Sequence, residues 1–437
     1  MRVRTIADVA GIAAAFACVL LVATVHRWFP LLEAAGLRRE AQTSNSRSLR
    51  AWEARNKHQR YELPVAVKIG ETVVIASSFQ YCWFPTIHRF RSGEILATVR
   101  RGPDARDPES EFSAYTLSKN GGHTWTRLYP LGSGANVDAA YTQTPENDLW
   151  VLGGGYDSAD SVPTEQRTRF RVPLSKFSYR GLEFNQTRNA LLELAHPAAT
   201  EPAKVIGPTR EDSRMLGRDL PLVNPWGEIV DGKNGEWLTT VYYKTGLDPQ
   251  STRLVLVRST DGGMTWNEIS IIARVPDDAA RWSWMGDEGP NEAGMVRLRD
   301  GSLFVVFRTG GYLGCTRSLD DGATWIQPQP MPFQGVAPRL RLLSNGMLAL
   351  SFGRPGPVLV AFSRDGKGYG WSTPVEIFRG MGTRYTDFVE VAPGNLLLVY
   401  DSIPYGWNAI PRADRMAKNT VCGTFIQVIQ DKGRLSL

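Results

Sequence analysis

Short runs in which apolar and polar residues alternate begin near Val65 and recur to the end of the chain. A period of two residues is typical of strands with one buried face. In four places two such runs flank a turn that contains glycine, and the second run is rich in aliphatic residues. The four predicted hairpins are 84–100, 293–308, 338–354 and 386–400. The pattern therefore predicts an all-β chain built from antiparallel hairpins.

A second pattern is an octapeptide of the form Ser-x-Asp/Asn-x-Gly-x-Thr-Trp. It occurs at 118–125, 259–266 and 318–325, and, one residue longer, at 363–371. The Asp or Asn side chain can accept backbone N–H bonds across a tight turn, glycine allows φ > 0, and Trp begins a strand on its apolar side. We assign these segments a structural role. Residues 178–184 form a degenerate copy with Arg180 in the Asp position.

The octapeptide resembles the Asp-box (BNR) repeat of sialidase-like β-propellers. The last three copies start at residues 259, 318 and 363, at spacings of 59 and 45 residues. Because a four-stranded blade takes roughly 40–50 residues, these copies are expected in successive blades. The resemblance implies a sialidase-like six-bladed β-propeller over residues 65–437. Residues 420–430 form a strand with no following partner, which we expect to pair with the strands of 65–77 and close the ring. Between Asp157 and Asp231 the regularity weakens, and we expect long loops there.

The first 64 residues have a different character. Arg2 and Arg4 precede an apolar run from Val9 to Val25. This length is short for a membrane-spanning helix and slightly long for the core of a cleaved signal peptide. Residues 1–27 are predicted to be a signal anchor, with a cleaved signal peptide as the alternative, and residues 28–64 a charged linker or stalk. The propeller is then extracytoplasmic: membrane-anchored at the cell surface or in the periplasm, or secreted.

Composition excludes several classes of function. The net charge of +6 is spread along 437 residues without a basic run, which argues against a nucleic-acid partner. Beyond the N-terminal segment only Cys82, Cys315 and Cys422 remain, so at most one disulfide can form. The five histidines lack metal-ligand spacing, and we expect no metal and no cofactor.

The hairpin at 293–308 carries a pair of polar residues. Glu292 precedes its first strand and Arg308 ends its second, so both side chains are expected at the same mouth of the propeller. In sialidases of this fold a Glu, followed after fifteen to nineteen residues by an Arg, supplies an activating carboxylate and one arm of an arginine triad. Residues 291–308 resemble that element.

Two later segments extend the resemblance. Residues 350–354 are similar to the strand that carries another triad Arg, here Arg354. Residues 384–388, Arg-Tyr-Thr-Asp-Phe, resemble the segment that bears the nucleophilic Tyr, here Tyr385. The family's general acid is an Asp on a loop after the first hairpin, which implies Asp107, with Asp104 and Glu109 as substitutes.

These residue types suit a 2-keto sugar acid. The substrate carboxylate would repel an anionic nucleophile, whereas a neutral Tyr hydroxyl approaches without that cost. Because the ordinary pKa of Tyr is about 10, Tyr385 needs a base, and Glu292 would take its proton. Guanidinium groups bind a carboxylate in bidentate fashion, the role implied for Arg308 and Arg354.

One position departs from the family. Trp83 stands where sialidases have the first Arg of the triad. It is a candidate for stacking on a sugar face, or else a core residue, and Arg100 or Arg101 could supply a substitute charge. The expected function is a sialidase-type glycosidase that removes a terminal sialic acid or related sugar from a glycan partner. The alternatives are a non-catalytic glycan- or protein-binding propeller at the cell surface and a uronate polysaccharide lyase.

Overall fold

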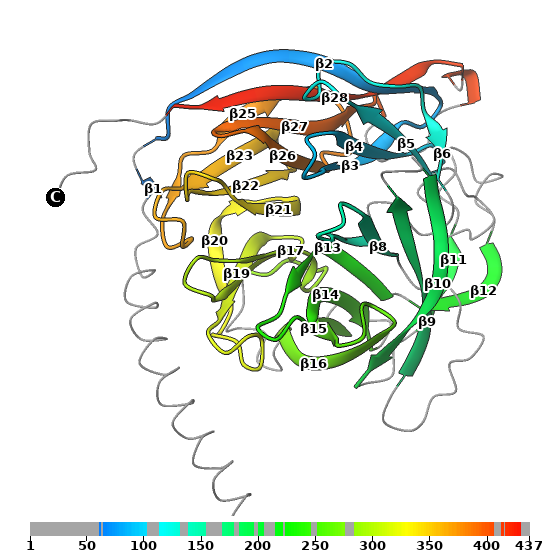
Figure 1. Cartoon of the computed structure of the whole chain (residues 1–437), viewed down its shortest axis with the longest axis vertical. Coiled ribbons are helices and arrows are strands. Elements are labelled where there is room, and N and C mark those ends of the chain that lie inside the picture. The colour runs from blue at the N-terminus through cyan, green and yellow to red at the C-terminus, as the bar shows by residue number, and fades with distance from the viewer. Residues whose placement is uncertain are drawn as a thin grey trace, which may run out of the picture. The chain divides into compact units, whose positions relative to one another are not determined.

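The computed structural model describes most of the chain after residue 60 (Figure 1). The described residues are 61–62, 64–102, 113–131, 139–153, 168–178, 183–195, 200–204, 215–221, 223–245, 251–275, 284–405, 412–414 and 416–429. The predicted anchor (1–27), nearly all of the predicted linker, and Asp104, Asp107 and Glu109 lie outside them. In the part of the chain described, no helix is long and apolar enough to cross a bilayer. The described residues belong to one compact unit, His58–Leu437.

The regular secondary structure of the described residues consists of β-strands and one short 3-10 helix, η3 (Arg412–Asp414). Four sheets have four strands each. They are β3 (Trp83–Arg89), β4 (Ile95–Arg100), β5 (Ser113–Ser118), β6 (Tyr129–Pro130); β17 (Asn291–Arg297), β18 (Leu303–Arg308), β19 (Tyr312–Ser318), β20 (Gln329–Gln334); β21 (Val336–Leu342), β22 (Leu348–Gly353), β23 (Val358–Ser363), β25 (Val375–Phe378); and β26 (Thr386–Ala392), β27 (Asn395–Ser402), β28 (Lys418–Val428), β2 (Val67–Phe79).

Eight further strands form a closed barrel from two antiparallel four-stranded runs. The runs are β7 (Ala139–Gln143), β8 (Leu149–Gly153), β9 (Thr168–Ser178), β10 (Glu183–Leu194) and β13 (Val223–Asp231), β14 (Trp237–Lys244), β15 (Thr252–Ser259), β16 (Thr265–Arg274). Parallel pairs β7–β13 and β10–β16 join them. Two small sheets pair β1 (Tyr61–Glu62) with β24 (Trp371–Ser372) and β11 (Thr200–Lys204) with β12 (Met215–Pro221).

The first strand of each four-stranded run lies next to the first strand of the following one. These first strands are β3, β7, β13, β17, β21 and β26, and the contacts β13–β17, β17–β21, β21–β26 and β26–β3 place them around a common centre (Figure 1). The core lies between neighbouring sheets; Val305 and Phe307 of β18, for example, pack in one cluster with Leu254 and Leu256 of β15. This arrangement is consistent with a β-propeller.

The four predicted hairpins are confirmed as β3–β4, β17–β18, β21–β22 and β26–β27. The predicted closure is confirmed too, because β28 pairs antiparallel with β2 along nearly its whole length. The expectation of long loops between 157 and 231 is wrong for 168–194, where β9 and β10 pair along their length. Their exposed face is charged, so the segment reads as polar although Phe170 and Val172 are buried.

Three first strands begin with the same irregularity. The second residue has a left-handed backbone at Phe84 of β3 (φ 51°), Glu292 of β17 (φ 42°) and Ala337 of β21 (φ 46°). The hairpin register shifts at each of these points, which marks a β-bulge. In β13 the corresponding bulge has Gly227 (φ 86°). Since a bulge re-aims the side chain at its position, the starts of the first strands are where polar groups can be turned toward the common centre.

The three octapeptides and the longer copy at 363–371 form one kind of turn, called here the Ser-x-Asp turn. In 259–266, Ser259 Oγ donates to Asp261 Oδ1 (2.8 Å) and accepts from Gly263 N (2.8 Å). Asp261 Oδ1 also accepts from Met264 N (3.0 Å) and Thr265 N (2.9 Å). The indole N–H of Trp266 donates to Gly263 O (2.8 Å). The turn at 259–266 therefore satisfies its own backbone and places the buried Trp266 in β16, the last strand of its four-stranded run.

The carboxylate of the Ser-x-Asp turn can be tested by two substitutions at one position. We expect Asp261→Ala to lower the free energy of unfolding by about 1–2 kcal/mol, because several N–H and O–H donors lose their acceptor. Asp261→Asn is expected to cost much less, since Asn120 makes the matching bonds in 118–125, including one to Thr124 N (2.9 Å). Urea unfolding of both variants measures the difference; equal losses would mean that the charge, not the hydrogen bonding, stabilises the turn.

Candidate active site

Three polar side chains meet at the start of the first strands. Tyr385 immediately precedes β26, Glu292 is the second residue of β17, and Arg308 is the last residue of β18. The register of the β17–β18 hairpin pairs Asn291 with Arg308, which places Glu292 and Arg308 side by side. The left-handed backbone at Arg384 (φ 69°) turns the chain just before Tyr385. Residues distant in sequence are thus brought to one point.

The contacts among these side chains are direct. The Tyr385 hydroxyl donates a hydrogen bond to Glu292 Oε1. Arg308 Nη1 donates to the same Glu292 oxygen (2.9 Å) and to the Tyr385 hydroxyl oxygen (3.1 Å). The second oxygen of Glu292, Oε2, accepts from the backbone N of Ala337 (3.1 Å), at the bulge of the neighbouring first strand. Glu292 is therefore held through both oxygens, with Oε1 aimed at the phenol.

The electrostatics keep the phenol protonated at rest. Tyr385 is 8% exposed, and its burial, reinforced by the adjacent Glu292 charge, raises the pKa of Tyr385 well above its ordinary value, against the opposing effect of Arg308 and Arg354. Burial by itself would lower the pKa of Arg308, but Glu292, Tyr385 and Glu288 outweigh it and raise that pKa. The phenol can therefore lose its proton only to a neighbouring base, and Glu292 is the carboxylate in contact with it.

Two further residues complete the polar rim. Arg308 Nη2 forms an ion pair with Glu288 Oε1 (2.5 Å), whose side chain is 37% exposed. Arg354 lies with its guanidinium carbon 5.3 Å from the centre of the Tyr385 ring, and its Nε donates to Thr383 O (2.8 Å). The site thus reaches solvent beside Glu288 and Arg354. Sequence patterns gave no signal for Glu288, which stands in no recognisable motif.

An aromatic cluster surrounds the phenol. The rings of Phe84 and Trp226 meet the Tyr385 ring in edge-on geometry, with centroids 4.8 Å and 6.1 Å away. Trp83 belongs to the same cluster but is only 1% exposed, and its indole N–H donates to Gly102 O (2.9 Å). Of the two roles considered for Trp83, this position agrees with packing the core. Arg101, considered as a substitute charge, donates through Nε to Ser78 Oγ (3.0 Å).

The structure thus brings together Tyr385, Glu292, Arg308 and Arg354 of the residues expected from the sequence, and it places Trp83 in the same hydrophobic cluster as Tyr385. Asp107 lies outside the described residues. Sequence reasoning missed Asp401, near the end of β27, and Thr383. Asp401 accepts from Thr383 N (2.6 Å), from the Thr383 hydroxyl and from Phe84 N (3.2 Å). Thr383 Oγ1 in turn accepts from Tyr385 N (3.2 Å), so Asp401 anchors the segment that carries Tyr385.

Asp401 makes a specific contribution to the dependence of stability on pH. Burial raises its pKa from 3.8 to about 6, although hydrogen bonds from Thr383 and Phe84 oppose the shift. The folded state then holds this proton more tightly than the unfolded state. The stabilising contribution is fully present below pH 3.8 and is lost as pH rises through about 6.

We expect this contribution to appear as a difference between wild type and Asp401→Asn. The free energy of unfolding of wild type, minus that of the variant, should fall by about 2 kcal/mol between pH 4 and pH 7, because only the wild type must ionise the buried carboxylate at position 401. Urea titrations at several pH values measure it. A difference that stays flat or rises with pH would show that Asp401 has no raised pKa.

The known proteins to which this chain is similar are solved structures with a similar fold. No protein-family model matches the chain, and the curated proteins give no significant match. The chain is similar to the crystal structure of a protein of unknown function from Dyadobacter fermentans DSM 18053 (TM-score 0.59, 20% identity, covering 83% of this chain and 99% of that one). It is also similar to the Hadza microbial sialidase Hz136 (TM-score 0.53, 14% identity, 80% and 66%).

A third similar structure is the alpha-L-arabinanase of Penicillium chrysogenum complexed with arabinobiose (TM-score 0.54, 15% identity, covering 82% of this chain and 99% of that one). At such low identity these likenesses concern the fold alone. The expectation of a sialidase-like fold is confirmed: the chain shares its fold with a sialidase and with an arabinanase.

Proposed function

We propose that the protein is a retaining glycosidase in which Tyr385 is the nucleophile and Glu292 is its base. The observation that carries the proposal is the hydrogen bond from the Tyr385 hydroxyl to Glu292 Oε1, with Arg308 in contact with both groups. A buried phenol that is hydrogen-bonded to a fixed carboxylate is the arrangement that nucleophilic catalysis by Tyr needs, because the base must lie within hydrogen-bond reach of the phenol.

The proposed reaction has two displacements. In the first, the Tyr385 oxygen bonds to the anomeric carbon, Glu292 takes the phenol proton, and the bond to the leaving oxygen breaks. A general acid protonates that oxygen, and Asp107 is our candidate for it. In the second, water attacks the anomeric carbon and the bond from that carbon to the Tyr385 oxygen breaks. The attacking water gives a proton to the general-acid residue, and Glu292 returns to the Tyr385 oxygen the proton that it took in the first displacement. Two inversions give net retention.

The sugar proposed first is a sialic acid or a related acidic sugar. Arg308 and Arg354 are the guanidinium groups beside Tyr385, and Arg354 lies over its ring. A carboxylate on or near the anomeric carbon would meet them as a sugar reaches the phenol. A neutral phenol suits this substrate because it does not repel that carboxylate.

An uncharged glycoside is the second candidate. Trp83 occupies the core at the position of the missing triad Arg, and Arg308 is already paired with Glu292 and Glu288. Both features reduce the positive charge available to a substrate carboxylate. An arabinose-containing glycan, as bound by the similar arabinanase, would need no such clamp.

A panel of aryl glycosides tests the proposal and chooses between the two sugars. The full chain is incubated with aryl α-sialoside, aryl uronides and aryl α-L-arabinofuranoside, and the released phenol is measured. Rapid acid quenching followed by peptide mass spectrometry should show a glycosyl group on the peptide that contains Tyr385. Glycan binding without turnover would favour a non-catalytic binding propeller, and an unsaturated product would indicate a lyase.

We also propose that the two four-stranded runs of the closed barrel are two blades, which together with the four separate sheets gives six.

The apolar run at 9–25 supports an extracytoplasmic location with an N-terminal anchor. Fractionation of cells that express the full chain tests this: the protein should remain with membranes and be accessible to protease from outside the cytoplasm. If added protease failed to cleave the chain in whole spheroplasts, the extracytoplasmic location would be contradicted.

A further inference from the structure

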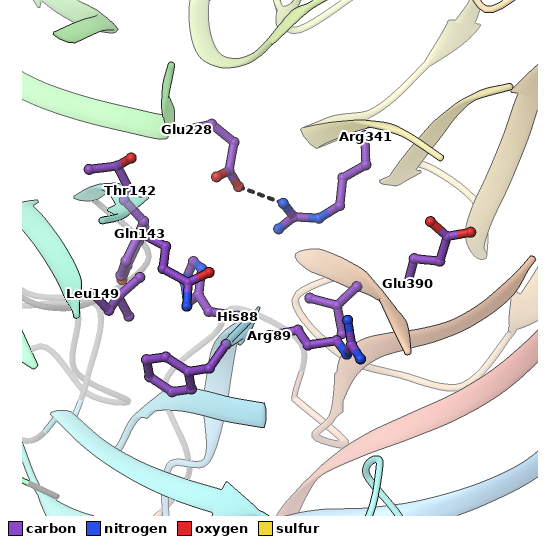
Figure 2. A pocket seen from close by; sticks show the side chains of 11 residues that line it. His88, Arg89, Thr142, Gln143, Leu149, Glu228, Arg341 and Glu390 are labelled. Carbon is purple, nitrogen blue, oxygen red and sulfur yellow. Dashed lines mark ion pairs between the residues drawn. The ribbon is translucent and has the colours of Figure 1, made fainter. Parts of the chain in front are cut away.

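A cavity of about 280 Å³ lies near the C-terminal ends of the first strands, whereas the candidate active site lies near their starts. It is called here the axial pocket (Figure 2). His88 and Arg89 line it from the end of β3, Arg341 from the end of β21, and Glu390 from β26. Tyr385 and Glu292 come instead from the strand starts. At about 3.3 Å per residue, Phe84 beside Tyr385 and His88 in the pocket are roughly 13 Å apart along β3. The axial pocket is therefore separate from the candidate active site.

The acidic groups around the axial pocket already have partners. Arg341 pairs through Nη1 with Glu228 Oε1 (3.0 Å) and through Nη2 with Asp387 Oδ1 (3.1 Å), and Figure 2 shows the first of these pairs. Glu390 accepts hydrogen bonds from Ser344 N (2.8 Å) and Gly394 N (2.7 Å). Because these carboxylates are neutralised or bonded, the pocket offers no strong site for a cation.

Two basic side chains, by contrast, have hydrogen-bonding capacity that no described residue fills. His88 is 8% exposed, and its Nε2 has no hydrogen-bond partner among the described residues. Its ring packs on Tyr141, with centroids 4.1 Å apart. Burial lowers the pKa of His88 to about 3, so the imidazole is neutral. Arg89, the next residue, is exposed at the rim, and no described residue forms an ion pair with it.

An unpartnered buried nitrogen destabilises the fold, and such groups are rare in native proteins. A pocket that keeps one while its carboxylates are satisfied is suited to a ligand that completes the hydrogen bonding. A neutral imidazole suits a hydroxyl, and an exposed guanidinium suits a carboxylate. The volume of about 280 Å³ is large enough to hold one sugar ring.

We propose that the axial pocket binds a small hydroxy-carboxylic acid, with its carboxylate on Arg89 and a hydroxyl on His88 Nε2. Phe90, Tyr141, Leu149 and Val389 supply the apolar part of the lining. The site is independent of the glycosidase proposal, because it shares no side chain with the Tyr385 cluster.

Calorimetric titration of the full chain with D-glucuronate, D-glucose and acetate tests the proposal. Glucuronate combines a carboxylate with ring hydroxyls, glucose lacks the carboxylate and acetate lacks the hydroxyls. We expect glucuronate to bind at least tenfold more tightly than either. Arg89→Gln should weaken its binding at least tenfold, whereas Arg91→Gln, an exposed neighbour outside the lining, should not. Tyr385→Phe should leave the affinity unchanged, since it alters only the other site.

His88→Phe gives a second readout in the same experiment. It keeps a ring against Tyr141 and removes the unpartnered nitrogen, so binding should fall at least tenfold while the thermal midpoint stays the same or rises. Three results would overturn the proposal: no glucuronate binding by the wild type, equal affinity for glucose, or loss of binding in Tyr385→Phe with Arg89→Gln unaffected. Arg89 is exposed, so its substitution reports on the pocket even if the His88 variant folds poorly.

Discussion

Replacement of Tyr385 by Phe is expected to lower turnover of any glycoside that the wild type hydrolyses by at least about a thousandfold. The substitution removes the oxygen that would bond to the anomeric carbon. It leaves Arg308 on Glu292 (2.9 Å) and the aromatic contacts of the ring in place. The hydroxyl loses two hydrogen bonds, one donated to Glu292 and one accepted from Arg308, so stability should fall by about 1–2 kcal/mol. Release of phenol from aryl glycosides, measured beside urea unfolding, gives both quantities.

Tyr243→Phe is the matched control. The Tyr243 hydroxyl donates to Glu268 Oε2 (3.0 Å), so this variant also deletes a phenol–carboxylate hydrogen bond. It lies on β14, paired with β13 and β15, and it takes no part in the Tyr385 cluster. Turnover should be unchanged there while stability falls by a similar amount. Full activity in Tyr385→Phe would remove the proposed nucleophile, whatever the control shows.

The hairpins could be predicted because their signals are local. Alternation of apolar residues and a glycine at positive φ, such as Gly93, Gly301, Gly346 and Gly394, determine where a strand ends and the next begins. The Ser-x-Asp turns share this property, since nearly all their hydrogen bonds connect residues within four positions. Because the residues that interact in these hairpins and turns lie close together in the sequence, the local pattern was enough to predict them.

The region from 157 to 231 was harder to predict for a physical reason. In β9 the side chains of Arg169 and Arg171 are exposed and those of Phe170 and Val172 are buried, so the alternation is present. A proline at position 173 and the charged residues hide it from a reading based on composition. The β10–β16 pair joins Leu192 to Trp266, and contacts so distant in sequence leave no trace in either segment alone.

The site was partly predictable because the resemblance named its residues one at a time. What brings Glu292 to Tyr385 is the bulge at the second residue of β17 and the N–H of Ala337 on the next sheet, and neither has a sequence signal. Two of the three hydrogen bonds that Asp401 accepts come from the backbone N–H groups of Thr383 and Phe84, which carry no side-chain signal, and the third comes from the Thr383 hydroxyl. A sequence motif does not show which backbone N–H groups will donate to a side chain, so these contacts to Glu292 and Asp401 are seen only in the structure.

Arg308→Met is expected to abolish turnover and to lower the free energy of unfolding by about 3–5 kcal/mol. Glu292 and Arg308 have side-chain exposures of 7% and 13% and form an ion pair at 2.9 Å. Removal of the cation leaves a buried carboxylate without its counter-charge, which is far costlier than loss of an exposed pair. Arg379→Met, which breaks the exposed pair with Glu376, is the control and should leave stability and turnover unchanged.

The double variant Arg308→Met with Glu292→Gln separates stability from catalysis. A neutral amide needs no counter-charge, so we expect the double variant to recover most of the stability that Arg308→Met loses. Turnover should stay absent, because neither a base for Tyr385 nor its adjacent guanidinium remains. Urea unfolding of the four members of the cycle gives the coupling energy of the pair. If Arg308→Met alone were as stable as wild type, the Glu292 carboxylate would have another counter-charge. If the double variant hydrolysed glycosides at the wild-type rate, Glu292 could not be the base on which the proposed mechanism rests.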